Sequence, residues 1–494
     1  MKPQNEAVLA GEGLAKADDE RLPIALLFFV LIVVACLMPA QNDTWWLLRT
    51  GEEMWQSGRV MLRDEFTHTV TGQFWLNHEW GAQLLFYGLY RIGGLPLLTA
   101  FCAAAVISAW WIVSRLTPGS VGLRLILIGT GAALTTAGWS LRAQTITLGL
   151  FATTLWIVVR ARFLWVLPLI FLVWANLHGA VATGGMLIAS GFIAALLVRR
   201  ELLFPLSIVG TFCGVAMTLT PLGLSFWLEI PRSIARAKAI GIDEWRVPAL
   251  TNPADLPLWA AVIGLAVVII RAKDKLRSYE SLTLAIASAV TLLLALRGAR
   301  NIALFFVCAV PTAAMFLTSH ATPEGTSATG ARFKSILVAC AVLCAAFVGY
   351  AWSKPLDRLA WHPVPDQMRT AIEQCDGALY NRYDEGGYLL WFVKGRKVFM
   401  DSRQDPFPEQ MVIDQRRLEA TGDYEETFDR YAIRCALVLE GSPLSRRLAN
   451  DGWHSHPAGP GWIVYSTSKR SDEHSKNVLG HSAGKQPNRW GGGV

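Results

Sequence analysis

Residues 41–80, QNDTWWLLRTGEEMWQSGRVMLRDEFTHTVTGQFWLNHEW, form a long polar insertion between the first apolar run of the chain and a series of further apolar runs. Tryptophans stand in this insertion beside titratable side chains, namely Asp43, Glu52, Glu53, Asp64, Glu65, His68, His78 and Glu79. Ionisable side chains at a membrane are costly to keep there, and they therefore mark candidate functional sites. We expect the chemistry of the protein to lie in this insertion.

The composition around the insertion is that of a polytopic membrane protein. Of the 494 residues, 53% are hydrophobic and 17% are charged, against about 25% charged in soluble domains. The mean hydropathy is +0.35, and apolar runs long enough to cross a bilayer recur through the first two thirds of the chain. We expect a mainly α-helical transmembrane bundle over residues 22–351. The sequence gives about eleven spans, at 22–40, 95–114, 121–138, 145–159, 163–177, 181–198, 202–220, 256–270, 281–296, 302–318 and 333–351.

Basic residues predict the orientation of this bundle. With a cytoplasmic N-terminus, the inside turns are rich in basic residues, namely Arg115, Arg124, Arg160, Arg162, Arg199, Arg200, Arg271, Lys273, Lys275, Arg277, Arg332 and Lys334. The outside turns hold few basic residues, as the positive-inside rule requires. We therefore expect a multi-pass membrane protein with a cytoplasmic, disordered tail over residues 1–21. Residues 41–94, 221–255 and everything after residue 352 are expected outside the cytoplasm.

The net charge and the cysteines add little to this interpretation. The formal charge of +7 comes from short loops and the tail, so we expect no nucleic-acid partner. The sequence contains no P-loop, no Rossmann glycine fingerprint and no CxxC pair. Six of the eight cysteines lie in apolar runs, where they are expected as small packing residues. Cys375 and Cys435 lie in the polar C-terminal part, and their pairing is left open.

The pattern changes over residues 355–468, where we expect a small α/β domain outside the membrane. Short apolar runs at 378–380, 397–400, 435–439 and 461–465 alternate with amphipathic helical segments at 410–420, 424–431 and 443–450. Gly386-Gly387 and Asp401-Ser402-Arg403 are expected in loops. Arg382, Asp384, Asp401 and Arg403 could cover the site or bind the acceptor, and the interpretation as internal ion pairs and turn residues is favoured. The tail over residues 469–494 is expected to be disordered.

Asp43 directly follows the first apolar run, and residues 44–57 have the pattern of an amphipathic helix that ends at Gly58. Trp45, Leu48 and Trp55 are expected to face the membrane interface. Asp43 then has two possible roles, which are compatible. It is the N-cap of this helix, or it is a general base that takes a proton from an attacking hydroxyl or amine.

The other acids and histidines of the insertion allow several interpretations. Asp64-Glu65 is either a second acidic pair or a solvated turn, and the turn is favoured. His78-Glu79 is not a zinc-protease motif, because Gln83 stands where the second histidine belongs. With Asp43 or Asp64, His78 and Glu79 could instead hold a divalent cation such as Mg²⁺ or Mn²⁺, or contact a phosphate-linked donor.

Arginines at the outer ends of spans suit a phosphate, because guanidinium groups bind phosphate through two parallel hydrogen bonds. Arg142, Arg297 and Arg300 are the candidates, and His178 lies on the same face. Tryptophans near these residues could stack on sugar rings, although most are expected as interfacial anchors. These tryptophans are Trp45, Trp46, Trp75, Trp80 and Trp245.

This arrangement resembles the GT-C superfamily of membrane glycosyltransferases, and most closely its protein mannosyltransferase and aminoarabinose transferase branch. Asp43 matches the acid after the first span of that branch, residues 44–57 its helix and Gly58 its glycine. His78-Glu79 takes the place of a basic-Pro-Pro segment, and Thr44 replaces a second acid. The chain is also similar to bacterial membrane proteins with Asp-x-x-Trp after the first span, Asn-x-His-Gly, Arg-Asn and Asp-x-Arg, here beginning at Asp43, Asn176, Arg300 and Asp401.

The resemblance implies a glycosyltransferase that moves a sugar from a polyprenyl-phosphate donor to an extracytoplasmic lipid, glycan or protein, with inversion. Asp43 would be the base, with Glu79 as a second catalytic candidate. His78, His178, Arg142, Arg297 and Arg300 would bind the donor. Two alternatives stay open, a transporter or flippase of a lipid-linked saccharide and a non-catalytic envelope assembly protein. Internal repeats are typical of transporters, and none is evident in this sequence.

Overall fold

A computed structural model describes residues 22–318, 331–354 and 359–467 of the chain. The expected disordered tails at 1–21 and 469–494 lie outside these described residues. The chain divides into two compact units. The membrane unit comprises Met1–Leu62 and Phe74–Pro363, and the C-terminal unit comprises Arg63–Gln73 and Val364–Val494.

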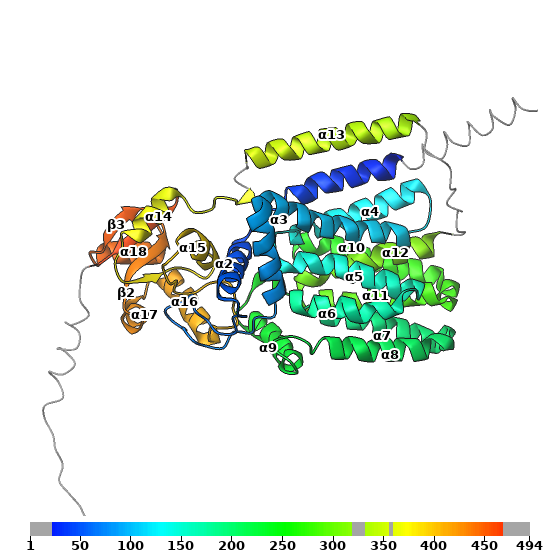
Figure 1. The fold of residues 1–494 in the computed structure, drawn as a ribbon, viewed down its shortest axis with the longest axis horizontal. Helices are drawn as coiled ribbons and strands as arrows, with labels where there is room; N and C mark the ends of the chain where they lie inside the picture. The colour runs from blue at the N-terminus through cyan, green and yellow to red at the C-terminus, as the bar shows by residue number, and fades with distance from the viewer. Residues whose placement is uncertain (1–21, 319–330, 355–358, 468–494) are drawn as a thin grey trace, which may run out of the picture. The chain divides into compact units, whose positions relative to one another are not determined.

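The membrane unit is built from helices, as Figure 1 shows. They are Leu22–Cys36, α2 (Asn42–Ser57), α3 (Trp80–Leu116), α4 (Val121–Thr135), α5 (Ala143–Arg160), α6 (Leu167–Leu177), α7 (Val181–Val198), α8 (Leu203–Ala216), α9 (Ser225–Ala239), α10 (Leu256–Arg271), α11 (Tyr279–Ala295), α12 (Ile302–Leu317) and α13 (Ala331–Ser353). Among the described residues, seven helices are long and apolar enough to cross a membrane, and three shorter helices are apolar. The mainly α-helical, polytopic fold is confirmed, while the count of eleven spans stays a prediction.

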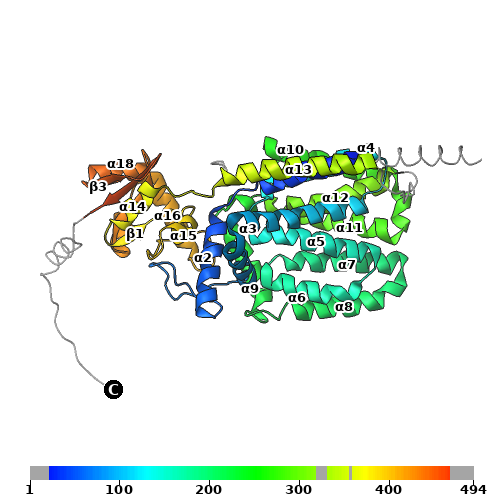
Figure 2. The same ribbon diagram turned by 45° about the horizontal axis from the view of Figure 1, so that its top comes forward.

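The apolar helices pack into one bundle. Helix α5 packs against α3 and α7, and α11 packs against α7 and α12; the same helices lie side by side in Figures 1 and 2. Their contacts bury large side chains such as Trp110, Phe151 and Phe305 completely. In a membrane, this close packing replaces the hydrophobic effect as the force that holds helices together.

Helix α3 contains a break ahead of the span expected at residues 95–114. Gly93 and Gly94 leave the helical conformation, and Gly94 has φ +63, which a side chain would disfavour. Pro96 follows and cannot donate the backbone hydrogen bond of a helix interior. The first part of α3 therefore changes direction before the span that begins near Leu95.

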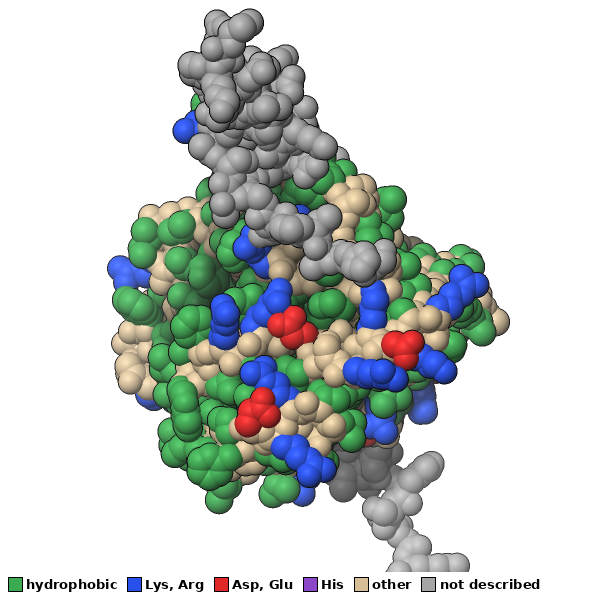
Figure 3. Space-filling view, turned by 90° about the vertical axis from the view of Figure 1, so that its right-hand side faces the viewer, with side chains coloured by type: hydrophobic (Ala, Val, Ile, Leu, Met, Phe, Trp, Pro, Cys, Tyr) green, Lys and Arg blue, Asp and Glu red, His purple; other side chains and the backbone are tan. Residues whose placement is uncertain are grey.

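Most of the predicted inside turns gather at one end of the bundle. Arg160, at the C-terminal end of α5, forms an ion pair of 2.9 Å with Glu280 and donates to the carbonyl of Arg115. Arg199 lies over the ring of Tyr279, and Lys275 donates to carbonyl groups at the end of α12. Figure 3 shows Lys and Arg side chains spread over one face, with few acidic ones. We name this end of the membrane unit the basic end.

The C-terminal unit contains a sheet flanked by short helices. Its described elements are α14 (Asp366–Glu373), β1 (Ala378–Tyr380), α15 (Gly386–Phe392), α16 (Glu409–Thr421), α17 (Glu425–Arg430), β2 (Ile433–Leu439), α18 (Pro443–Asn450), β3 (His454–Pro457) and β4 (Trp462–Ser466). The strand order is β1-β2-β4-β3, with β1 parallel to β2 and the other pairs antiparallel. This α/β architecture confirms the fold class expected for residues 355–468.

Two predictions for this unit are wrong. The run 397–400 forms no strand, only a single parallel bridge between Val398 and Thr67. Gly386-Gly387 begins helix α15 instead of lying in a loop. Gly386 is required there by close packing, because a Cβ atom would come within 2.1 Å of the carbonyl oxygen of Met400.

The middle of the polar insertion belongs to the C-terminal unit rather than to the membrane unit. In segment Arg63–Gln73, the ring of His68 hydrogen-bonds the carbonyl of Leu379 at 2.9 Å, and Thr69 donates to the carbonyl of Phe399. The loop predicted as one element over residues 41–94 is thus divided between two units.

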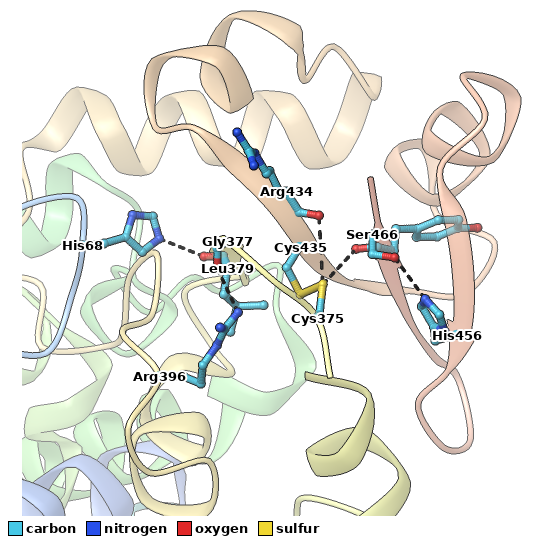
Figure 4. The surroundings of a disulfide bond; sticks show 10 residues. His68, Cys375, Gly377, Leu379, Arg396, Arg434, Cys435, His456 and Ser466 are labelled. Atoms are coloured by element: carbon cyan, nitrogen blue, oxygen red, sulfur yellow. Dashed lines mark hydrogen bonds between the residues drawn. A yellow bond between two sulfur atoms is a disulfide. The ribbon is translucent and has the colours of Figure 1, made fainter. Parts of the chain in front are cut away.

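Cys375 and Cys435 form a disulfide in the C-terminal unit, which answers the question left open above. Their Cα atoms lie 5.8 Å apart and their separation in sequence is 60 residues. Figure 4 shows the bond joining strand β2 to the chain between α14 and β1. Disulfides persist in oxidising compartments, so the bond is consistent with a C-terminal unit outside the cytoplasm.

Candidate functional site

Polar side chains from several helix ends meet at the end of the membrane unit opposite the basic end. Arg142 directly precedes helix α5, and Arg160 is its last residue. Arg142 therefore lies at the end of α5 that is opposite the basic end. Around Arg142 lie residues of the helix starts and the connecting turns. These residues are Gln41, Asp43, Glu79, Gln144, His178, Glu244 and Arg300.

Asp43 lies in the first turn of α2, where the helix and two neighbours hold its carboxylate. The indole N–H of Trp46 donates to Oδ1 at 3.1 Å, and Nη1 of Arg142 lies 3.3 Å from Oδ2. The predicted N-cap role is wrong, since Gln41 is the N-cap and shares a capping box with Thr44. The predicted helix and its end at Gly58, which has φ 67, are confirmed.

Arg142 connects the carboxylates of the site. Its guanidinium donates to Oε1 of Gln41 at 3.0 Å and forms two bonds to Glu244, at 2.6 and 3.0 Å. Burial alone would lower the pKa of Arg142, but the charges of Asp43, Glu244 and Glu79 outweigh it and raise the pKa. Arg142 is therefore a permanent cation inside a ring of acids.

Arg300 supplies a second cation to the same cluster. Nη2 donates to Oε1 of Gln144 at 3.0 Å, the guanidinium carbon lies 4.7 Å from the ring centroid of Trp245, and Nη1 is 3.9 Å from Glu244. Arg297 behaves differently, because its side chain is exposed and forms no ion pair with any described residue. The donor-binding role of Arg297 stays a prediction.

Glu79 lies between two histidines. Its Oε1 is 3.4 Å from Nε2 of His178 and 3.7 Å from Nε2 of His78. The indole of Trp174 donates to Oγ1 of Thr147, which in turn contacts Nδ1 of His178 at 2.8 Å. When the Thr147 hydroxyl donates to Nδ1, the ring proton of neutral His178 sits on Nε2 and faces Glu79.

Burial sets the protonation of this second cluster. Burial, together with the negative charge of Asp43, raises the pKa of Glu79 to about 7, against the opposing effect of Arg300 and Arg142. Burial and the charges of Arg300, His78 and Arg142 hold the pKa of His178 well below its ordinary range. Near neutral pH, Glu79 is thus poised between its two forms while His178 is neutral.

A Glu79→Gln variant is expected to change the pH dependence of stability. The pKa of Glu79 rises from an ordinary 4.5 to about 7 on folding, so the folded protein keeps a proton that the unfolded chain releases. This contribution is complete below about pH 4.5 and is lost as the pH rises through about 7. We expect the Tm of the wild type to fall by several degrees relative to the variant over that range, since a pKa difference of this size corresponds to about 3 kcal/mol of stability.

His178 changes the stability with pH in the opposite direction to Glu79. The effect of Glu79 must therefore be measured as the difference between the wild type and the variant. A lowered folded pKa makes the His178 contribution grow as the pH rises toward its ordinary pKa. Glu53→Gln is the control, since Glu53 lies on α2 and pairs with Arg49 at 3.1 Å. Parallel Tm profiles for Glu79→Gln and the wild type would show that Glu79 carries no buried proton.

The divalent cation expected from the sequence stays a prediction. Asp64, one of its four candidate ligands, belongs to the C-terminal unit, where its carboxylate is completely buried against Arg403 at 2.5 Å. The described residues contain no group of three or more His, Cys, Asp or Glu side chains placed to hold a metal ion. Asp64-Glu65 is not a solvated turn either, because Asp64 accepts the backbone N–H groups of Phe66 and Thr67 from the interior.

Most tryptophans of the site are structural rather than interfacial. Trp45 and Trp75 are almost completely buried, and Trp46 packs edge-on against Trp75 with centroids 5.9 Å apart. Leu48 is buried as well, while Trp55 is exposed as expected. The indole of Trp80 donates to the side chain of Asn176 at 2.9 Å, which ties the start of α3 to the end of α6.

Comparisons with solved structures identify the architecture. The chain is similar to the archaeal oligosaccharyltransferase AglB from Archaeoglobus fulgidus, in complex with an inhibitory peptide and a dolichol-phosphate, at 13% identity and TM-score 0.51 over 90% of this chain and 74% of that chain. It is also similar to the arabinofuranosyltransferase AftD from Mycobacteria, at 15% identity and TM-score 0.53 over 90% of this chain and 40% of that chain. Both are GT-C proteins. This chain has the GT-C fold.

The GT-C fold confirms the architecture implied by the resemblance in the sequence. No family model and no curated protein sequence matches the chain. At these identities the likeness concerns the fold, and this chain spans only 40% of the length of AftD. The roles of individual residues within the GT-C fold therefore rest on the geometry described above.

Sequence reasoning missed three residues of the site, Gln41, Gln144 and Glu244. Gln41 and Gln144 stand within two residues of predicted site residues, so proximity to Asp43 and Arg142 was the only available signal. Glu244 lies in the expected outside loop 221–255, where other acids are equally plausible. Only the structure brings Glu244 to the arginines.

Proposed function

We propose that this protein is a membrane glycosyltransferase that moves a sugar from a polyprenyl-phosphate donor to an extracytoplasmic acceptor, with inversion at the sugar. The GT-C fold supports the class of reaction, and the AglB structure contains a dolichol-phosphate. The observation that carries the proposal is the position of Asp43 beside Arg142, with Arg300 in the same cluster. A base and two phosphate-binding cations are the groups that such a transfer needs.

Asp43 can act as the base because part of its carboxylate remains accessible. Its side chain is 27% exposed, although Trp46 and Arg142 orient it. The carboxylate accepts the proton of the acceptor hydroxyl or amine, and the acceptor atom forms a bond to the anomeric carbon. The bond from that carbon to the phosphate oxygen breaks on the opposite face, which inverts the configuration.

Arg142 and Arg300 can stabilise the leaving group. The departing polyprenyl phosphate takes the bonding electron pair and gains one negative charge, which two guanidinium groups at the membrane surface can match. Glu79, His78 and His178 would line the donor site on the other side of Asp43. A proton on Glu79 keeps that side of the site from repelling an anionic donor.

The orientation follows from the same proposal. The site end faces the extracytoplasmic side of the bacterial inner membrane, and the basic end faces the cytoplasm, as the positive-inside rule requires. The disulfide between Cys375 and Cys435 supports an extracytoplasmic C-terminal unit. The N-terminus is then cytoplasmic, and membrane lipids surround the bundle.

Proteoliposomes containing the full chain test the reaction class. We expect the protein to release polyprenyl phosphate from at least one labelled donor of a polyprenyl-phosphate sugar panel when an envelope extract supplies acceptors. A flippase would instead move the donor across the bilayer and leave it intact, and an assembly protein would do neither. Intact donor under all conditions would therefore reject the glycosyltransferase.

A further inference from the structure

The two arginines of the donor site already hold an anion, the carboxylate of Glu244. Arg142 binds it with two hydrogen bonds, at 2.6 and 3.0 Å, and Arg300 lies 3.9 Å from Oε2. One anion held by two guanidinium groups is the arrangement that a phosphodiester would take. A donor phosphate and Glu244 therefore need the same hydrogen-bond donors.

The Glu244 side chain is more exposed than the two arginines, so it is the member of the cluster that can leave. The Glu244 side chain is 40% exposed, whereas the side chains of Arg142 and Arg300 are 11% and 25% exposed. When Glu244 leaves, Arg142 keeps Gln41 and Asp43, and Arg300 keeps Gln144. The cations are preorganised without Glu244, and the departing carboxylate regains water at little cost.

Glu244 lies in a short turn whose two ends are anchored. Gly241, three residues earlier, has φ +66, a conformation that glycine adopts without strain. On the other side, Arg246 is anchored by two bonds to buried Asp255, at 2.5 and 2.8 Å, and its carbonyl accepts the N–H of Ala299. The N–H groups of Gly241 and Ile242 donate to carbonyls at the end of α9, so the segment Asp243–Trp245 is held on both sides and displacement of Glu244 requires only a rotation of its side chain.

We propose that Glu244 is an internal competitor that occupies the phosphate position of the resting site and must be displaced by the polyprenyl phosphate of the donor. This inference rests on the proposed function, since it assigns a regulatory role to the same arginines. The bonds from Arg142 keep Glu244 ionised, because they lower its pKa against the effect of burial. The site is then electrically balanced when no donor is bound.

Calorimetric titration of the purified full-length protein tests the competition. The probe is farnesyl phosphate, with farnesol and inorganic phosphate as controls for the lipid tail and for a free anion. We expect Glu244→Gln and Glu244→Ala to bind farnesyl phosphate at least tenfold more tightly than the wild type, and farnesol equally. Asp243→Asn is the matched control, because Asp243 is the neighbouring acid, 94% exposed and only 3.8 Å from Arg246.

Each outcome separates the two proposals. If the wild type binds farnesyl phosphate and the Glu244 variants bind no more tightly, the competition is wrong while the donor site stands. If Asp243→Asn tightens binding as much as Glu244→Gln, net charge explains the effect and the competition is wrong. If neither the wild type nor the folded variants bind farnesyl phosphate, the arginines are not a donor site and both proposals fail. Equal gains for inorganic phosphate and farnesyl phosphate would overturn the assignment to a lipid-borne phosphate.

Discussion

An Asp43→Asn variant is expected to lose sugar transfer by a factor of about 10²–10⁴, the range that a positioned general base supplies. Asparagine has nearly the same shape and can still accept the indole N–H of Trp46, so α2 should form normally. It cannot take the proton of an acceptor, and it removes the charge that lies 3.3 Å from Arg142. The loss should appear in the rate of polyprenyl-phosphate release in proteoliposomes.

A second readout distinguishes a lost base from a damaged fold. The Asp43 charge contributes to the raised pKa of Glu79, so the variant should move the Glu79 step in the pH–stability profile to lower pH. Glu53→Gln, a change on the same helix outside the cluster, should keep the transfer rate of the wild type. Wild-type transfer by well-folded Asp43→Asn would refute the assignment of the base.

The elements of the fold could be predicted where the signal is local. The helix after the first span and its end at Gly58 follow from apolar periodicity and from the conformation of glycine. In the C-terminal unit, residues 378–380 and 443–450 were predicted to the residue as β1 and α18. Each of these features depends on neighbours within a few positions of the chain.

The site could be predicted only in part, because helix ends from distant positions build it. Alternating spans place Asp43, Arg142, His178 and Arg300 at one end, and the structure brings these residues together. Arg297 shares that end but is exposed. Whether a residue at this end belongs to the cluster depends on the direction of its side chain within one helical turn. The spacing of the spans in the sequence does not predict that direction.

Pairing over long separations was not predictable at all. Asp64 was expected in solvent because a charged pair in a polar insertion usually is solvated. Its partner Arg403 lies 339 residues away, in a group of charged residues for which internal ion pairs are favoured from the sequence. Nothing local indicates that residues 63–73 complete the C-terminal unit.

Replacing Arg403 by methionine is expected to destabilise the C-terminal unit by about 3–5 kcal/mol, the cost of leaving buried charges without their partner. Arg403 is completely buried, and it binds Asp64 at 2.5 Å and Asp401 at 2.7 and 2.8 Å. Its loss leaves two carboxylates in the interior, Asp64 with donors from Thr67 and Asp401 with the backbone N–H at position 403. Arg382→Met is the control, because Arg382 is 25% exposed and its acidic partners lie 3.6 Å away.

Hydrogen–deuterium exchange on the full chain would locate the damage. Asp64 lies near the start of the part of the polar insertion that belongs to the C-terminal unit. Arg403→Met should therefore increase exchange both in Arg63–Gln73 and around Val398. Adding Asp64→Asn and Asp401→Asn removes both buried charges, and it should restore more than half of the lost stability. Unchanged exchange in Arg63–Gln73 would show that the bridge and the bonds of His68 and Thr69 hold the segment without Arg403. The chain continues from the two ends of this segment toward Asp43 and Glu79. Faster exchange in the segment together with slower sugar transfer would therefore show that the buried ion pair supports the site.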